Sequence, residues 1–579
     1  MPRRSGPSDL PVLGSYPAQR CARRVHNEFA PGPRVALPIS PEVQARIDAG
    51  RLFESAIFDE IRDSATASGG AVADLTIAAT GEDWDRGTQR TLEAIGDGAD
   101  VIIGGRLPEI NSRSGAPDVL VRHGEGYLPV DVKNHRTLRA SAKPAKPANP
   151  RPSAHVLVSA LTAPDVTVPQ SGYSNRATSW QKDVMQLAHY TRMLQELGFH
   201  AGPLLGGIIG TSDMTALLGC THAITWYDLD IADVATYSRS SPTHVTKRSA
   251  LQRYDHEFGF RVAVAAAARS GEEIVRPYHI TECATCEWFD HCTEVAGPTD
   301  ASFATETGLL TVRQWRYLYT QCGDGTALSI DELAAADPAT HSAGFCEHSP
   351  TGLAPAQRLE NVIRRARMTV AGVDLELDGA QTPEVPQADI EIDFDIEWDL
   401  DQRIYQWGLR IRDCHDDGTA RYEPIVSFYP LDDDAEAALA EQFAARIDAL
   451  CETADRLGRS LRIFHWNHPE ISLTKRFPAV QRVLDGVTVD LMKWFASVFF
   501  CRTSLSIKDV AAIFGFFWDV ENAGGEASQY MIDVARGDGP EAAEARRWCL
   551  RYNECDVAAQ AAIRDGVRQM LAGSARPQR

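Results

Sequence analysis

Three residues in the first third of the chain are of the types that support phosphodiester hydrolysis. Asp118 follows Pro117, and Asp131 and Lys133 lie two residues apart in Asp131-Val132-Lys133. Side chains at i and i+2 share one face of a strand, so this carboxylate and ammonium would point the same way. Phosphodiester cleavage needs a hard cation held by carboxylates and benefits from a positive group near the nucleophile. A solvated hairpin face could carry the same residues, so the short pattern alone leaves both interpretations open.

The surrounding sequence resembles the PD-(D/E)XK nucleases of the RecB type. Pro117-Asp118 and Asp131-Val132-Lys133 match the two halves of the family motif. Upstream, Gly50-Arg51-Leu52-Phe53-Glu54 is similar to the first helix of the family. The resemblance implies that Glu54 is a further metal ligand, with Glu93 as a rival for that role.

Downstream residues extend this resemblance and add positive charge. Gln186 and Tyr190 match the Q-x-x-x-Y helix of the group, and their spacing puts them on one helical face, where they would contact DNA or support the site. Residues 134–151 contain basic side chains and no acidic one; they are Arg136, Arg139, Lys143, Lys146 and Arg151. Such a segment is either a solvated loop or a set of phosphate contacts that position a nucleic acid without recognising its sequence.

Four cysteines form a second candidate site. Cys283, Cys286 and Cys292 have the spacing C-x2-C-x5-C, which is typical of zinc or iron–sulfur ligands. His291 could complete a local zinc site, and Cys21 offers a fourth thiolate from the other end of the domain. One early and three late cysteines resemble the iron–sulfur subgroup of RecB-type nucleases, which implies a [4Fe–4S] cluster joining both ends of the domain. Zinc and a reduced set without metal remain the alternatives.

A third candidate site begins with an alternating acidic segment. Apolar residues separate five carboxylates, which are Glu391, Asp393, Asp395, Glu397 and Asp399. The alternation predicts a half-buried strand with one acidic face. That face is either a charged edge that prevents aggregation or a set of carboxylates whose repulsion a divalent cation relieves.

Together with a distant helix, this strand resembles the RNase H-like 3′–5′ exonucleases of the DEDD type. Phe394-Asp395-Ile396-Glu397 matches the first motif, and Tyr552 with Asp556 matches the last motif in its tyrosine form. The middle motif departs, because Glu470 stands where Asp is usual, which leaves activity less certain than the fold. The resemblance implies that Asp395, Glu397, Glu470 and Asp556 hold two Mg²⁺ or Mn²⁺ ions while Tyr552 orients the attacking water.

The elements that must position these residues follow from periodicity. Helices are predicted over 41–63 and 180–197, a hairpin over 118–122 and 127–133, and strands over 101–107, 204–211 and 222–228. A Lys/Pro/Ala-rich stretch, 139–152, predicts a mobile loop. Strands over 390–398, 404–411 and 461–466 begin a second α/β pattern. The expected organisation is an α/β PD-(D/E)XK restriction-endonuclease-like domain over 1–300, a helical connector over 301–385 and an RNase H-like domain over 386–579.

Charge and hydropathy limit the possible functions. The 579 residues contain 58 basic and 79 acidic groups, a formal charge of −21. Residues 1–300 contribute 30 basic and 35 acidic groups, and the remainder 28 and 44, so the acidity lies mainly in the second part. A surface that binds nucleic acid everywhere is therefore excluded, whereas a local basic groove is not. Because no run of 18 apolar residues or signal-peptide pattern occurs, we expect a cytoplasmic protein with no membrane partner.

These observations predict a metal-dependent nuclease that acts on single-stranded or open-ended DNA in repair or processing. The whole arrangement resembles a bacterial group of predicted RecB-family nucleases. A nucleic-acid-binding scaffold with an inactive RNase H-like domain, or an exonuclease acting on RNA, are the alternatives. No G-x-x-x-x-G-K-[ST] motif occurs, so unwinding of a duplex would need a helicase partner.

Overall fold

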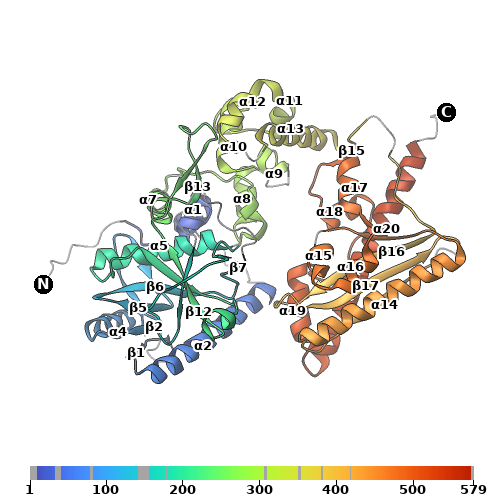
Figure 1. Cartoon of the computed structure of the whole chain (residues 1–579). Coiled ribbons are helices and arrows are strands. Elements are labelled where there is room, and N and C mark those ends of the chain that lie inside the picture. Colours follow the sequence, from blue (N-terminus) through green and yellow to red (C-terminus); the bar gives the residue numbers. More distant parts are fainter. Residues whose placement is uncertain are drawn as a thin grey trace. The chain divides into compact units, whose positions relative to one another are not determined.

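The computed structural model contains two compact units. It describes residues 10–32, 41–77, 83–140, 155–177, 179–305, 310–349, 354–379, 383–416, 419–467 and 469–574. The N-terminal unit comprises Met1–Pro298, Gly308–Gln321 and Pro338–Leu359, and the C-terminal unit comprises Thr299–Thr307, Cys322–Asp337 and Glu360–Arg579. The segment 301–385 thus contributes helices to both units (Figure 1).

The N-terminal unit is built on an eight-stranded mixed sheet. Its strands, in spatial order, are β1 (Val72–Asp74), β2 (Val101–Ile103), β5 (Val119–His123), β6 (Gly126–Val132), β11 (Leu205–Ile209), β12 (Ala223–Asp228), β8 (Val156–Ala160) and β9 (Val168–Gln170). β5 and β6 form the predicted hairpin, and β6 continues the sheet by parallel pairing with β11. The strand predicted over 101–107 is shorter than expected, because Gly104 adopts a φ of +67° and ends β2.

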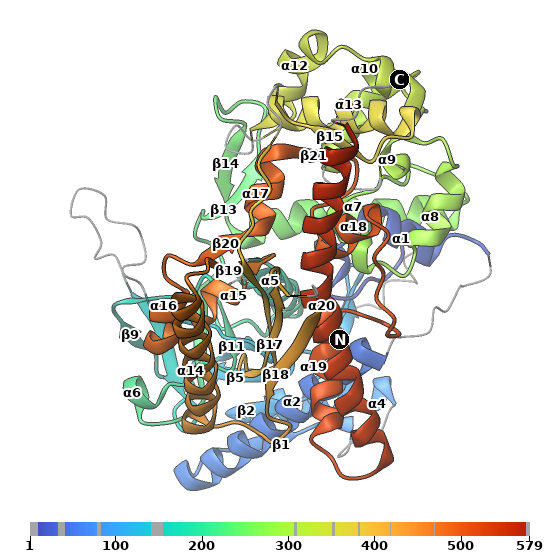
Figure 2. The ribbon, with the colours of Figure 1, turned by 90° about the vertical axis from the view of Figure 1, so that its right-hand side faces the viewer.

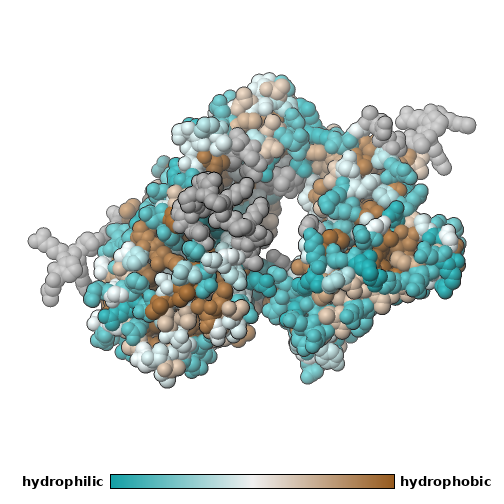
Figure 3. Space-filling model, viewed as in Figure 1, coloured by the Kyte–Doolittle hydropathy of each residue, from teal (hydrophilic) through white to brown (hydrophobic). Residues whose placement is uncertain are grey.

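Helices cover both faces of this sheet. Helix α2 (Pro41–Ser68), which includes the predicted helix 41–63, packs Ile57 and Ile61 against the inward side chains of β2, β5 and β6. Helix α5 (Trp180–Leu197) covers the other face with Leu187 and Leu194, and it ends at Gly198, whose φ is +78°. Figure 1 shows α5 lying across the strands of the sheet. Hydrophobic residues gather over part of this unit on the face shown in Figure 3.

The C-terminal unit contains a five-stranded sheet whose central strand is acidic. The spatial order is β18 (Ala420–Val426), β17 (Ile404–Asp413), β16 (Ile390–Trp398), β19 (Leu461–His465) and β20 (Thr488–Asp490). β16 pairs antiparallel with β17 and parallel with β19, so it is not the exposed edge that its charges could indicate. The predicted strands over 390–398, 404–411 and 461–466 correspond to β16, β17 and β19, whereas β18 and β20 were not predicted.

The two faces of β16 pack against two different helices (Figure 2). Ile392, Phe394 and Ile396 lie in a core with helix α14 (Asp433–Leu457), where Phe443 is fully buried. The acidic residues of β16 face helix α20 (Pro540–Ser574), which supplies their polar partners. Among the described helices of both units, none has the length and apolarity needed to cross a membrane.

Candidate functional site

The hairpin of the N-terminal unit brings Asp118, Asp131 and Lys133 together. Asp131 lies on β6 with no exposed surface, and Lys133 Nζ lies 2.7 Å from Asp131 Oδ2. The backbone N–H of Val132 donates to Asp118 Oδ2 at 2.7 Å, which ties the two strands across the site. The other oxygen of Asp131, Oδ1, is buried without a hydrogen-bond partner among the described residues, although buried polar atoms are normally satisfied. Buried, unsatisfied carboxylate oxygens are suited to hold a cation.

Electrostatics also make this group a candidate functional centre. Burial, followed by the charge of Asp131, raises the pKa of Asp118 well above its usual range. Burial disfavours the charged form of Lys133, but Asp131 and Asp118 outweigh this effect and raise the pKa of Lys133. The ammonium therefore stays protonated beside two carboxylates that repel each other. Shifts of this kind cluster at functional sites.

Glu54, rather than Glu93, reaches this centre. Burial raises the pKa of the Glu54 carboxyl, and the charges of Lys133 and Asp131 both act on it. Glu93 lies on helix α4 (Trp84–Gly96), where its exposed side chain accepts a hydrogen bond from Gln89. The oxygens of Glu54, Asp118 and Asp131 do not all lie within 4.8 Å of one another, so these three carboxylates are spaced too widely to contact one ion together without moving.

Gln186 and Tyr190 support the site from α5. Gln186 Nε2 donates to Tyr190 Oη at 3.1 Å, and Tyr190 Oη donates to the carbonyl oxygen of Ala116 at 3.2 Å. This chain fixes the loop that carries Asp118, and a Cβ on Gly115 would lie 2.9 Å from the Tyr190 ring. Of the two roles predicted for this pair, the geometry corresponds to support of the site.

A neighbouring pair of residues was not predicted from the sequence. The structure describes only part of the predicted basic segment. His135 Nε2 lies 3.3 Å from Asp183 Oδ2, and the hydrogen bond that His135 donates to this carboxylate raises the pKa of His135. Asp183 is three residues before Gln186 on α5, so helical spacing could have identified it. Arg136 and Arg139 follow the hairpin, and Arg139 begins β7 (Arg139–Ala140). Lys143, Lys146, Arg151 and most of the loop predicted over 139–152 lie outside the described residues.

The four predicted cysteines line one cavity of the N-terminal unit. Cys21 precedes helix α1 (Ala22–Phe29), whereas Cys283, Cys286 and Cys292 lie on or next to a 3₁₀ turn (Thr281–Thr285) and helix α8 (Phe289–Ala296). The backbone N–H of Cys21 donates to Glu282 Oε1 at 2.9 Å, which joins these distant segments. Burial raises the pKa of all four thiols, and that of Cys283 reaches about 11.

The spacing of these sulfurs tests the two metal assignments. Four thiolates on one zinc ion at 2.3 Å lie roughly 3.8 Å apart. Among the described residues, the cysteines do not form a group whose ligand atoms all lie within 4.8 Å of one another. His291, the other candidate zinc ligand, does not line the cavity and packs against Trp288 instead. The set is therefore wider than a single zinc ion requires.

Three carboxylates of the C-terminal unit converge more tightly. Oxygens of Asp395, Glu397 and Asp556 all lie within 4.8 Å of one another, and no other set of three His, Cys, Asp or Glu does so within the described part of the chain. Asp395 and Glu397 share one face of β16, and α20 packs Asp556 against that face. Hard divalent cations prefer such oxygen ligands.

Burial and mutual repulsion raise the pKa of each member of this group. The pKa values of Asp395 and Glu397 lie well above their usual range, because burial disfavours the ionised form of each and the charge of Asp556 repels both. Burial raises the pKa of Asp556 to about 7, although Lys508 acts in the opposite direction. A divalent cation bound between these three carboxylates would reduce their repulsion.

Glu470 and Tyr552 lie beside this group, as the sequence predicted. Glu470 is the second residue of the short helix α15 (Pro469–Ser472), shares a hydrogen bond with Asp395, and has a pKa raised to about 7 by burial. Its Oε2 atom has no hydrogen-bond partner among the described residues. Tyr552 shares a hydrogen bond with Asp556, and its ring stacks on Trp548 with centroids 5.0 Å apart.

A family model described as RNase_H superfamily matches residues 393–567, which contain this carboxylate group. The chain carries a C-terminal RNase H-like domain. None of the curated proteins and none of the solved structures matches the chain.

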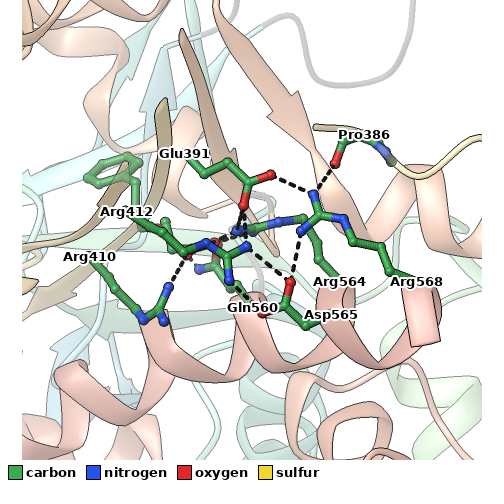
Figure 4. A network of polar contacts seen from close by, with 10 residues as sticks. Pro386, Glu391, Arg410, Arg412, Gln560, Arg564, Asp565 and Arg568 are labelled. Carbon is green, nitrogen blue, oxygen red and sulfur yellow. Dashed lines mark hydrogen bonds and ion pairs between the residues drawn. The ribbon is translucent and has the colours of Figure 1, made fainter. Parts of the chain in front are cut away.

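The RNase H-like domain neutralises part of its acidic strand with arginines (Figure 4). Glu391 pairs with Arg412, Arg564 and Arg568, and Asp393 pairs with Arg410 and Arg564. Asp399, at the other end of the strand, pairs with Arg536 at 2.6 Å. The prediction that a cation relieves the repulsion along the whole strand is therefore wrong for these three residues, and it stays a prediction for Asp395 and Glu397.

Four further residues hold the carboxylates of the RNase H-like domain and were missed in the sequence. Trp518 Nε1 donates to Asp556, Ser528 Oγ donates to Glu397, Asn553 Nδ2 donates to Asp395 at 2.8 Å, and Lys508 acts on Asp556 through its charge. Asn553 reaches Asp395 because Gly408 lies opposite on β17, where a Cβ would overlap the Asn553 side chain. Asn553 adjoins Tyr552 and could have been identified, whereas the other three carry no sequence signal.

Proposed function

We propose that the protein is a metal-dependent nuclease with a hydrolytic centre in each unit. The convergence of Asp395, Glu397 and Asp556 in an RNase H-like domain carries this proposal. These oxygens fit Mg²⁺ or Mn²⁺, and such ions polarise the phosphoryl oxygen and lower the pKa of the attacking water. RNase H-like domains are commonly nucleases.

The side chains around the C-terminal carboxylates divide the remaining tasks. Asn553 and Ser528 hold Asp395 and Glu397 by donating to one oxygen of each, which leaves the second oxygens for a cation. Glu470 adds an unsatisfied buried oxygen next to Asp395. Tyr552, held at Asp556, is positioned to orient the attacking water.

The second proposed centre is a PD-(D/E)XK site formed by Glu54, Asp118, Asp131 and Lys133. The unsatisfied Oδ1 atom of Asp131 supports it, as do the helix–hairpin–helix elements that surround this residue. Lys133 stays charged beside Asp131 and would position the attacking water or stabilise charge on the phosphate. Gln186 and Tyr190 hold the Asp118 loop in place.

We also propose that Cys21, Cys283, Cys286 and Cys292 hold a [4Fe–4S] cluster. Their common cavity and wide spacing favour a cluster over a single zinc ion, which is the alternative. Such a group would join α1 to α8 and contribute free energy to the folding of the N-terminal unit. Its proposed role is structural.

DNA with single-stranded or open ends is the substrate that we propose, in repair or processing. Arg136 and Arg139 follow the catalytic hairpin directly, and the N-terminal part of the chain carries little of the net negative charge. Basic side chains there would contact phosphates and position the strand. RNA is the alternative substrate for the C-terminal domain, and a helicase would be the partner on duplex DNA.

The test compares cleavage of matched DNA and RNA oligonucleotides by the whole protein and by variants of each centre. Asp395→Asn and Asp131→Asn should each remove a separate Mn²⁺-dependent activity, because each removes a metal ligand. Retention of full cleavage by the double variant would refute the proposal. Tight DNA binding by the wild-type protein without any Mn²⁺-dependent cleavage would instead indicate a scaffold.

A further inference from the structure

A second cavity of about 270 Å³ lies in the N-terminal unit, near one end of strands β8, β11 and β12. The residues that matter for its chemistry are Asn175, Arg176, Trp180, Tyr227 and Asp233. Its size suits a ring system rather than a single ion or water. None of the residues assigned to either nuclease centre or to the cysteine site lines this cavity.

The walls present flat surfaces and hydrogen-bonding groups with little net charge. The guanidinium of Arg176 stacks over the Trp180 ring, with its Cζ 4.4 Å from the centroid, and pairs with Asp233. Asn175 is held by its Nδ2, which donates to the carbonyl oxygen of Trp226 at 3.1 Å. Arg176 and Asp233 offset each other and Asp228 adds a negative charge, so the lining disfavours a phosphate and favours a neutral planar ligand.

The hydroxyl of Tyr227 independently points to a ligand in this cavity. The Tyr227 side chain is only 4% exposed and lines the cavity, yet its hydroxyl has no hydrogen-bond partner among the residues that the structure describes. Buried hydroxyl groups nearly always have one, because an unsatisfied group loses its hydrogen bonds to water without compensation. A ligand with a hydrogen-bonding edge would satisfy this hydroxyl.

The cavity adjoins the segments that are proposed to hold the substrate. Strand β7 (Arg139–Ala140) pairs with β10 (Tyr173–Ser174), which immediately precedes Asn175. Arg139 Nη2 donates to the carbonyl oxygen of Arg176 at 2.7 Å. Helix α5 connects the cavity to the catalytic centre, since Trp180 lies in its first turn and Gln186 farther along it.

We propose that this cavity receives a purine or pyrimidine base. The inference rests on the proposed nuclease function, and it assigns the base to a strand whose phosphates contact Arg136 and Arg139. Stacking on Trp180 would hold the ring, and Tyr227 with Asn175 would bind its polar edge. A single-stranded substrate is required, because a paired base cannot leave its stack cheaply. A base of a free nucleotide has the same chemistry and is the other source to distinguish.

The experiment measures binding of labelled 20-mer single strands by fluorescence anisotropy in EDTA, so that cleavage does not enter. One strand is intact, and each of the others carries a single abasic residue at a different position. The variants are Trp180→Leu, with Trp84→Leu as its matched control because Trp84 also stacks on an arginine, and Tyr227→Phe, with exposed Tyr429→Phe as its control. Thermal unfolding of every variant checks that the fold is retained.

The expected result is a loss of DNA-binding affinity that depends on which position of the strand lacks its base. Trp180→Leu should weaken binding of the intact strand by roughly 5- to 100-fold, and Tyr227→Phe by a smaller factor. The strand that lacks the base at the bound position should bind wild-type protein equally weakly and should lose nothing further in either variant. Equal losses on all strands, or no loss in either variant, would overturn the proposal.

Free deoxynucleoside monophosphates form the second arm. If they bind wild-type protein, fail to bind the Trp180→Leu variant, and the abasic scan is flat, the cavity takes the base of a free nucleotide. The nuclease proposal is tested separately by Asp131→Asn cleavage. Binding that depends on Trp180, combined with cleavage that is independent of Asp131, would refute the N-terminal catalytic centre and leave the cavity assignment standing.

Discussion

Arg564 Nη2 lies 3.2 Å from Asp393 Oδ2, and neither side chain is exposed to solvent. Two residues farther along the same strand face, Asp395 has no arginine or lysine within 4.0 Å in the described part of the chain; its partners are Asn553 and Glu470. One acidic surface thus has fixed cations at Asp393 and Asp399 and leaves Asp395 and Glu397, which lie between them, without one. These two residues are where a diffusible cation would bind.

Substitutions at these two positions should have opposite effects on the metal-free protein. Asp395→Asn removes repulsion among the three carboxylates and should raise the melting temperature by about 2–4 °C. Asp393→Asn weakens the pairing of a fully buried arginine and should cost about 3–5 kcal/mol of unfolding free energy. Calorimetry in EDTA measures both. Destabilisation of similar size in the two variants would contradict the difference between Asp393, which an arginine neutralises, and Asp395, which lacks a basic partner.

Mn²⁺ binding to the C-terminal centre should release protons near neutral pH. Glu470 and Asp556 have pKa values raised to about 7, so each is partly protonated there, whereas a bound cation favours the ionised form. The apparent affinity should therefore rise between pH 6 and pH 8. Isothermal titration in buffers of different ionisation enthalpy counts the protons, and a heat that does not depend on the buffer would exclude this linkage.

The N-terminal centre can be isolated in the Asp395→Asn background. There, Asp131→Asn and Lys133→Gln should each lower the cleavage rate by at least about 100-fold, because one removes a metal ligand and the other a positive charge at the phosphate. Arg139→Gln serves as the control and should weaken DNA binding while the rate at saturation stays within a few-fold. Circular dichroism confirms folding, and unchanged rates in both site variants would eliminate this centre.

The cysteine assignment predicts iron and a mechanical link between chain segments. Anaerobically purified protein should be brown and contain iron with acid-labile sulfide, and Cys283→Ser should lose both and lower the stability of the N-terminal unit. Cys451→Ser, a half-buried cysteine of the C-terminal unit, is the matched control. Colourless protein that contains one equivalent of zinc would show that the site holds zinc and not an iron–sulfur cluster.

His189 predicts how the N-terminal unit responds to acid. Burial lowers its pKa to about 4, while its ring contacts Tyr254 Oη at 2.8 Å and the carbonyl oxygen of Ser114 at 2.9 Å. Since the folded pKa lies below the unfolded value of 6.5, this stabilisation is complete above pH 6.5 and is lost as the pH falls toward 4, by up to about 3 kcal/mol. Urea unfolding of His189→Gln should show a shallower loss over that range than the wild type, and equal slopes would contradict this assignment.

Local patterns in the sequence predicted the elements that carry the sites. The alternation in 390–398 and the apolar and polar residues around Gly124 gave strands close to those observed, and Gly198 marked the end of α5. In each case the determining contacts lie within a few residues of each other. Short-range periodicity was sufficient there.

Long-range pairing is what the sequence could not reveal. β16 is a central strand because β19 pairs with it from 71 residues away, as in the pair Ile390 and Leu461. The arginine that neutralises Asp393 is Arg564, which is distant in the sequence. Gly408 leaves space for the Asn553 side chain, but in the sequence a glycine within a strand indicates only lower strand stability. The choice of Glu54 over Glu93 likewise depended on which helix packs beside β6.

The alternation of β16 makes this strand intolerant of insertion. One additional residue before Glu391 would turn every following side chain to the opposite face. Isoleucines and Phe394 would then meet Arg564 and Asn553, and the carboxylates would enter the core beside Phe443. The hydrophobic core and the group of three carboxylates would be lost together, so the register that forms this core is also the register that brings Asp395 and Glu397 to Asp556.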